Sequence, residues 1–173
     1  ATAQEILFTS GGTEANNWIL RSAVKDLKVR RIISSKMEHH AVLYPILELQ
    51  KEFDIQVEYV ENSADGVLDL THLVDLLSES TEKTLVSLMH VNNETGVILD
   101  LERVSQICQE HHALFHSDTV QSVGKAILDL QKVPIDFIVS SAHKFHGPKG
   151  VGFAFIRKNS GLQPLFFGGE QEK

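Results

Sequence analysis

The chain has 173 residues, of which 42% are hydrophobic and 23% charged, and its formal net charge is −7 at pH 7. This composition is typical of one soluble globular domain with a sizeable core. The negative charge argues against nucleic-acid binding, because contacts with phosphate need a basic face. No apolar run approaches the roughly 20 residues of a membrane helix, so we expect no direct membrane binding.

The single cysteine, Cys108, excludes an internal disulfide and favours a reducing compartment, for which we expect the cytoplasm. No secretory signal opens the chain. The first residue is Ala1 rather than methionine, and the last residues, "GGEQEK", contain no obvious stop element. We therefore expect a fragment of a longer protein.

Strand-like and helix-like segments alternate along the chain. In order, we expect a strand at 5–10, a Gly-rich turn and helix at 11–27, a strand at 31–35, a helix at 40–53, a strand at 55–60, a turn and helix at 64–80, a strand at 83–91, a helix at 100–112, and strands at 113–118, 135–142 and 151–158. The last strand follows a Gly-Pro-Lys-Gly turn and is expected to be antiparallel. This alternation predicts an α/β fold of βαβ units with a mostly parallel sheet.

Local residues indicate where several helices begin. Asp69 or Thr71 is expected to cap the third helix, and Asp100 the fourth. Pro45 is expected in the first turn of the second helix, where no backbone donor is lost. Cys108 falls on the apolar face of the fourth helix, so we interpret it as a packing residue.

The segments that follow the strands are where a ligand is expected, because open parallel sheets bind ligands beyond the carboxyl ends of their strands. After the first strand, the Gly11-Gly12-Thr13 turn opens a helix whose free amides and dipole suit an anion. Taken alone, however, the segment is better explained as a simple glycine turn with a Thr13 cap. The adjacent histidines His39 and His40 make a poor metal site. The sequence has neither a Cys pair nor an HExxH motif, so we expect no metal.

Lys144 and Asp118 each follow an apolar strand, where a charged side chain is costly unless it is paired or needed. A desolvated lysine amine has a lowered pKa and attacks carbonyl groups. A buried aspartate can keep a pyridine nitrogen protonated, which makes the ring an electron sink. With a Gly-Gly-Thr turn, a histidine, an asparagine and a glutamine at the same strand ends, the set suits a phosphorylated aromatic aldehyde.

Five stretches, "SGGTEANN", "MEHHAV", "HVNNETG", "HSDTVQSVGK" and "SSAHKFHGPKGVG", resemble the pyridoxal-phosphate (PLP) enzymes of the class V aminotransferase family. The resemblance runs through essentially the whole chain and is strongest to cysteine desulfurases of the NifS/IscS type. It implies a three-layer αβα fold in which residues 1–173 form the PLP-binding large domain of fold type I. An N-terminal segment and a C-terminal small domain would lie outside the chain, and the full enzyme would be a homodimer.

The resemblance also implies a role for individual residues. Lys144 would form the Schiff base with PLP, and His39 would stack on the ring and take part in proton transfer. Asp118 would pair with the pyridinium, Gln121 with the phenolic oxygen, and Asn93 would lie near the substrate carboxylate. The remaining expected contacts form the phosphate cradle: Gly12, Thr13, Ser141 and His143.

Two positions depart from this pattern or have no counterpart in it. His40 stands where relatives carry some other residue, so it receives no role. Ala142 stands where many relatives have glycine, which adds one methyl group beside the cradle.

The implied parent enzyme removes sulfur from L-cysteine to give alanine and an enzyme persulfide, for iron–sulfur cluster assembly or tRNA thiolation through a sulfur-acceptor scaffold protein. The nucleophilic cysteine would lie outside this chain, so the chain alone is expected to be inactive. A selenocysteine lyase or another class V aminotransferase stays open. So does a non-enzymatic domain that binds a nucleotide or anion, in which Lys144 contacts phosphate and Asp118 is an ordinary buried cap.

Overall fold

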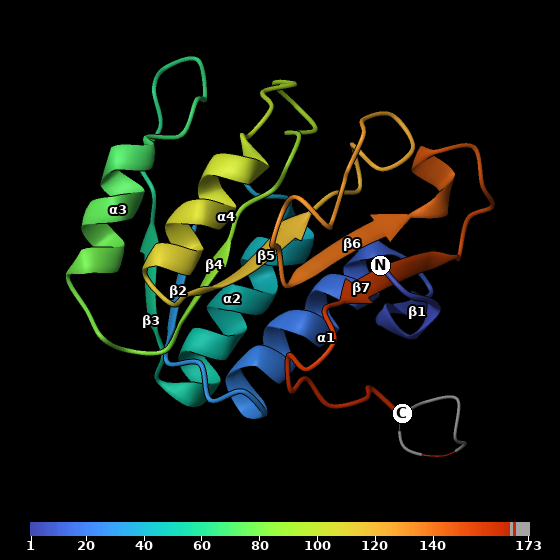
Figure 1. Cartoon of the computed structure of the whole chain (residues 1–173), viewed down its shortest axis with the longest axis horizontal. Helices are drawn as coiled ribbons and strands as arrows, with labels where there is room; N and C mark the ends of the chain where they lie inside the picture. Colours follow the sequence, from blue (N-terminus) through green and yellow to red (C-terminus); the bar gives the residue numbers. More distant parts are fainter. Residues whose placement is uncertain (167, 169–173) are drawn as a thin grey trace.

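The computed structural model describes residues 1–166 and 168 and contains one sheet between two layers of helices (Figure 1). The strands are β1 (Ile6–Thr9), β2 (Arg31–Ser34), β3 (Gln56–Tyr59), β4 (Thr84–Ser87), β5 (Leu114–Asp118), β6 (Phe137–Ser141) and β7 (Gly152–Ile156). The helices are α1 (Gly12–Lys25), α2 (His40–Phe53), α3 (Leu70–Ser78) and α4 (Leu101–Glu110), with the short 3-10 helices η1 (Ala3–Glu5) and η2 (Ala142–Lys144). The predicted chain end at 169–173 lies outside the described residues.

The seven strands lie in the order β1-β7-β6-β5-β4-β2-β3. The neighbours β6, β5, β4, β2 and β3 are parallel, whereas β7 runs antiparallel to both β6 and β1. The predicted mostly parallel sheet and the antiparallel last strand are therefore confirmed. The parallel register brings the carboxyl ends of β4, β5 and β6 to one edge of the sheet, with Asp118 opposite Val139.

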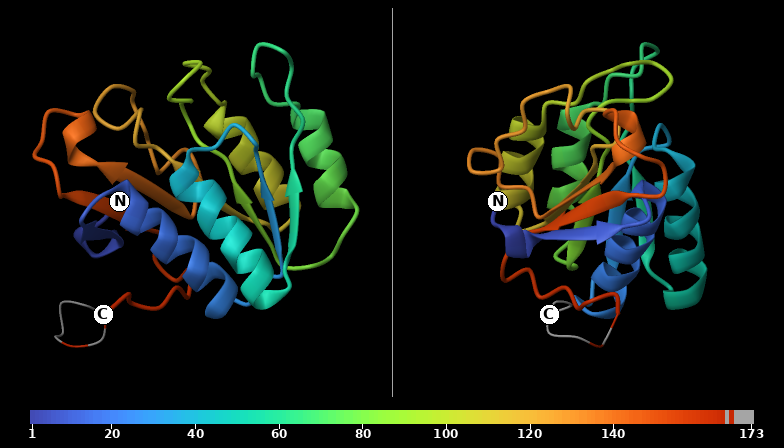
Figure 2. Two further views of the ribbon diagram at one scale, coloured as in Figure 1. Left: turned by 180° about the vertical axis from the view of Figure 1, so that it is seen from behind. Right: turned by 90° about the vertical axis from the view of Figure 1, so that its right-hand side faces the viewer.

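Two apolar clusters hold the layers together, one on each face of the sheet. Figure 2 shows α1 and α2 on one face and α3 and α4 on the other. Strand alternation explains the division, because successive side chains point to opposite faces. In β6, Phe137 packs with the α1 and α2 cluster, whereas the next residue, Ile138, packs with the α3 and α4 cluster.

The helix starts follow the local chemistry of the sequence. Asp69, rather than Thr71, caps α3 and accepts hydrogen bonds from two backbone amides, while Asp100 caps α4 through the amide of Arg103. Cys108 is buried on the apolar face of α4, and this burial raises the pKa of its thiol far above the ordinary value. Among the described residues, no helix is both long enough and apolar enough to cross a membrane.

The prediction for Pro45 is wrong in one respect. Helix α2 begins at His40, so Pro45 lies in its second turn rather than its first, where a proline removes one helix hydrogen bond. The Pro45 ring is buried against the core, and we infer that its packing offsets part of the lost bond.

Candidate active site

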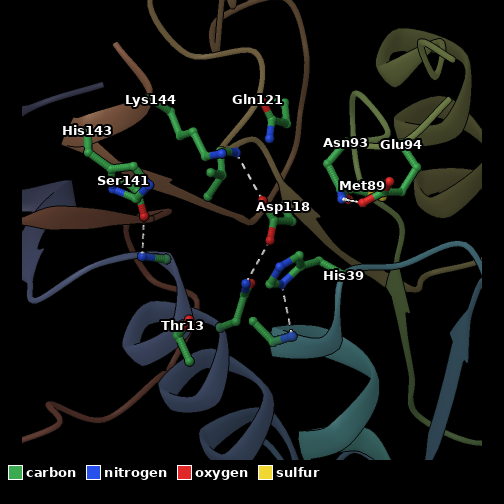
Figure 3. A pocket seen from close by; sticks show the side chains of 14 residues that line it. Thr13, His39, Met89, Asn93, Glu94, Asp118, Gln121, Ser141, His143 and Lys144 are labelled. Atoms are coloured by element: carbon green, nitrogen blue, oxygen red, sulfur yellow. Dashed lines mark hydrogen bonds between the residues drawn. The ribbon is translucent and has the colours of Figure 1, made fainter. Parts of the chain in front are cut away.

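A cavity of about 410 Å³ lies at the carboxyl edge of the sheet (Figure 3). This volume is in the range of small-molecule sites, about 300–1,000 Å³. The nine expected contact residues all line it: Gly12, Thr13, His39, Asn93, Asp118, Gln121, Ser141, His143 and Lys144. These residues span 133 positions of the sequence, from 12 to 144, so the fold of the whole chain is needed to bring them together.

The first turn of α1 forms one wall. The Gly12 amide donates to Ser141 Oγ at 2.7 Å, which ties the helix start to the end of β6. A Cβ atom on Gly12 would lie 2.7 Å from Val120 Cγ2, so a larger residue does not fit there. Among the described residues, the next two amides, those of Thr13 and Glu14, have no protein acceptor. Free amides at a helix start suit an anion.

Asp118 ends β5 with its carboxyl group buried, 5% exposed. Its Oδ1 accepts a hydrogen bond from the Val120 amide at 2.9 Å, and its Oδ2 accepts one from Asn16 Nδ2 at 2.8 Å. Burial raises the pKa of the Asp118 carboxyl, while the two hydrogen bonds and the nearby His39 act in the opposite direction. Both bonds come from neutral donors. No lysine or arginine in the described chain forms an ion pair with Asp118.

Lys144 belongs to the short helix η2, directly after β6. In Figure 3 its side chain extends into the cavity toward Asp118. The two groups therefore face one cavity, as a shared small ligand would require.

The two adjacent histidines point in different directions. His39 caps α2, where its Nδ1 accepts a hydrogen bond from the Ala41 amide at 3.0 Å. The neutral ring then carries its proton on Nε2. His40 instead stacks on Tyr44, with ring centroids 4.7 Å apart, on the outer side of α2 and away from the cavity lining.

The two adjacent asparagines divide in the same way. Asn92 is buried, and its Oδ1 accepts hydrogen bonds from the amides of Glu94 and Thr95, so it shapes the loop. Asn93 is exposed and lines the cavity, where its Nδ2 donates to Glu94 Oε1 at 2.6 Å. The asparagine that was expected near a ligand is thus the one on the cavity wall.

Five further residues line the cavity without having been expected from the sequence: Asn16, Ala41, Met89, Glu94 and Val120. Asn16 carried a usable signal, because it lies one turn from Gly12 and from Leu20 on the buried face of α1, where a polar residue is unusual. Met89 carried no such sequence signal, because its position depends on the conformation of the loop that follows β4.

Glu38 is a buried acid beside this site that the sequence reading also missed. Its Oε1 accepts a hydrogen bond from the Met89 amide at 2.6 Å, and its Oε2 has no partner in the described chain. Burial raises the pKa of Glu38 well above its ordinary value, and the charge of Asp118 adds to the effect. Glu38 lines a separate, smaller cavity of about 170 Å³ that shares Met89 with the first.

Residues 1–173 match the family model described as Aminotransferase class-V. The chain belongs to the class V aminotransferase family. This family is PLP-dependent, and the cavity fits that cofactor in three respects. The free amides after Gly12 suit a phosphate, Asp118 offers a carboxylate without a protein cation, and Lys144 offers an amine. Within the described chain, no three His, Cys, Asp or Glu side chains gather as metal ligands.

Three individual proteins illustrate what this class V protein is similar to. It is 42% identical over 174 residues to cysteine desulfurase IscS of Dictyoglomus turgidum, covering 99% of this chain and 43% of that enzyme. A solved NifS-like protein superposes with a TM-score of 0.91 at 41% identity, covering 99% of this chain and 48% of that one. The structure of SspA in complex with cysteine gives a TM-score of 0.89 at 34% identity, covering 99% of this chain and 50% of that one. The chain thus spans about half the length of these relatives or less.

Proposed function

We propose that the chain is the PLP-binding part of a cysteine desulfurase. The whole enzyme would remove sulfur from L-cysteine, giving alanine and an enzyme persulfide for iron–sulfur cluster assembly or tRNA thiolation. The observation that carries this proposal is that Lys144 lines one cavity with a buried Asp118 that forms no ion pair in the described chain. The similarity to a cysteine desulfurase and to a protein solved with bound cysteine supports the choice of substrate.

Different residues of the cavity would bind different parts of PLP. The amides at the start of α1, with Ser141 and His143, would hold the phosphate. Asp118 would hold a proton on the pyridine nitrogen, and Gln121 would donate to the phenolic oxygen. The His39 ring, fixed by its hydrogen bond to Ala41, would lie against the ring face.

When bound, PLP supplies an electron sink for the α-carbon of an amino acid substrate. Lys144 Nζ is the amine to which the cofactor's aldehyde would be attached. Since His39 Nδ1 is occupied by the Ala41 amide, Nε2 is the atom left to exchange a proton with substrate. The Asn93 amide group would orient the substrate carboxylate from the rim.

Cys108 is unsuited to be the sulfur acceptor of this reaction. It is buried on α4 in the apolar cluster, and its raised pKa keeps it a neutral thiol, whereas the thiolate is the nucleophile. The persulfide-forming cysteine would therefore belong to a part of the enzyme outside this chain, and the chain alone would be inactive. The homodimer, the scaffold partner and the cytoplasmic location stay predictions.

Three other functions were left open by the sequence. A selenocysteine lyase or another class V aminotransferase would use the same Lys144, Asp118 and His39, and the identity to IscS favours the desulfurase. A purely anion-binding domain would need the α1 turn alone. It would give no reason for Lys144 and the unpaired Asp118 to line the same cavity.

Covalent capture of the cofactor tests the proposal. The chain is mixed with an equimolar amount of PLP, reduced with borohydride, digested and mapped by mass spectrometry. We expect one adduct, on the peptide that holds Lys144, and its loss in Lys144→Ala. The matched control is Lys149→Ala, which removes a lysine from the same segment but not from the main cavity. An adduct that survives Lys144→Ala, or that spreads evenly over the surface lysines, rules out the assigned role of Lys144.

A further inference from the structure

Asn16 is a buried polar residue on the apolar side of α1. Its side chain is 0% exposed, and its neighbours on that side of the helix are Ile19, Leu20 and Ala23. A polar group in such a place must be hydrogen-bonded to be tolerated. The partner of Asn16 is Asp118, 102 positions further along the chain, through Nδ2 and Oδ2 at 2.8 Å.

The Asp118 carboxyl group is held from two sides. The Val120 amide donates to Oδ1 from the following turn, and Asn16 donates to Oδ2 from α1. The Val120 contact is local and belongs to the backbone, so no side-chain substitution removes it. Asn16 is the one side-chain donor to Asp118 within the described chain, and both residues line the cavity.

The Asn16 side chain turns its Nδ2 donor, rather than its oxygen, toward Asp118. The Asn16 Oδ1 is buried and has no partner in the described chain, so no other contact sets the orientation. The reversed amide would place Oδ1 against a carboxylate oxygen, and two acceptors would then face each other. The observed orientation therefore suits an ionised Asp118, which is the form that pairs with a pyridinium.

We propose that Asn16 is a positioning residue that keeps the Asp118 carboxylate ionised and turned toward the cavity. This inference rests on the proposed function, because it assigns Asp118 to the ring nitrogen of PLP. Burial raises the pKa of Asp118 and so favours the neutral acid, whereas the hydrogen bond from Asn16 lowers this pKa. Among the other charged or titratable groups around Asp118, His39 lowers its pKa, and the charge of Asp118 raises the pKa of Glu38. His143, Lys144 and Glu94 line the same cavity.

The test measures Asp118 itself and needs no cofactor. The full chain is labelled with 13C at the aspartate carboxyl carbons, and each resonance is followed by NMR as the pH is changed. The Asp118 resonance is assigned from its absence in Asp118→Asn. In Asn16→Leu, which nearly keeps the volume and removes the donor, we expect the Asp118 pKa to rise by about one unit, the equivalent of one charge-assisted hydrogen bond.

Two further variants keep the result interpretable. Asn16→Asp keeps the side-chain shape and replaces the donor by an acceptor, so it should raise the apparent pKa of Asp118 further. This variant tests the role of Asn16 even if Asn16→Leu does not fold. Asn17→Leu is the matched control, because Asn17 bonds only to the Thr13 carbonyl in the described chain. An Asp118 pKa that stays unchanged in both folded Asn16 variants, or that moves equally in Asn17→Leu, overturns the proposal.

The experiments distinguish a failure of the Asn16 proposal from a failure of the proposed function. If PLP fails to attach to Lys144 while the Asp118 pKa still moves in Asn16→Leu, the cofactor assignment is wrong and the coupling between Asn16 and Asp118 stands. If PLP attaches and the pKa does not move, Asn16 is a packing residue only.

Discussion

Buried ionisable side chains have different interaction partners at the two ends of the parallel strands. At the amino end, the fully buried Arg31 pairs with Glu58 on the neighbouring strand. Arg157, at the end of β7 that adjoins this edge, donates to three backbone carbonyl oxygens, those of Leu130, Val133 and Ile135. The protein itself therefore supplies the opposite charge or dipole at this end.

At the carboxyl end, the buried acids form no ion pair within the described chain. Asp118 and Glu38 accept hydrogen bonds from neutral amides only, and burial raises the pKa of both acids. Seven buried side-chain atoms in the described chain lack a hydrogen-bond partner. They are Arg31 Nη1, Asn16 Oδ1, Glu38 Oε2, His90 Nδ1, His116 Nε2, Ser117 Oγ and Ser140 Oγ. Such exceptions concentrate at functional sites, and two of these residues, Asn16 and Glu38, line the cavities at the carboxyl end.

Removing one partner at the amino end should give the largest change in stability. Arg31→Ala leaves a cavity and an unpaired Glu58, and we expect a loss of about 3 kcal/mol in the free energy of unfolding. The double variant Arg31→Met with Glu58→Leu removes both charges and keeps the volume, so it should recover most of that loss. Urea unfolding followed by circular dichroism measures both. A double variant as unstable as Arg31→Ala would mean that the ion pair does not explain the effect.

Removing the charge of Asp118 at the carboxyl end should increase the stability of the chain, by less than the loss expected for Arg31→Ala. Because burial raises the pKa of Asp118, the folded chain holds this proton to a higher pH than the unfolded chain does. Stability is then greatest below the ordinary aspartate pKa of about 3.9 and falls as the pH rises through the folded-state value. Asn cannot ionise, so Asp118→Asn should stabilise the cofactor-free chain by about 1 kcal/mol at pH 7. The gain should vanish near pH 3.

Thermal unfolding at several pH values checks this sign. If Asp118→Asn destabilises the cofactor-free chain at pH 7, then Asp118 is stabilised by its surroundings, and the contrast between the two ends of the sheet is wrong.

Much of the fold could be predicted because its signals are local. Asp69 and Asp100 cap their helices through amides two or three residues away, and the apolar runs of β5 and β6 mark buried strands by themselves. The cavity lining followed from one further rule, that ligands bind at the carboxyl ends of parallel strands. That rule needs only the identity of the residues at or shortly after each strand end, such as Asp118 and Lys144.

The features that could not be predicted depend on contacts between distant segments. The bond from Asn16 to Asp118 joins residues 102 positions apart, and the bond from Met89 to Glu38 joins residues 51 apart. Neither leaves a periodic pattern in the sequence. The interior position of Pro45 is a different case, because the expected helix bounds of 40–53 match α2 and already place Pro45 in the second turn.

The affinity of PLP for the wild-type chain and for Asp118→Asn, measured by absorbance titration at one pH, tests the central claim most directly. If Asp118 pairs with the pyridinium of bound PLP, Asp118→Asn should still bind PLP through Lys144 and the α1 turn. Its affinity should be about tenfold lower, because one charge-assisted contact is lost. Equal affinities would show that Asp118 does not meet the cofactor and would contradict the claim.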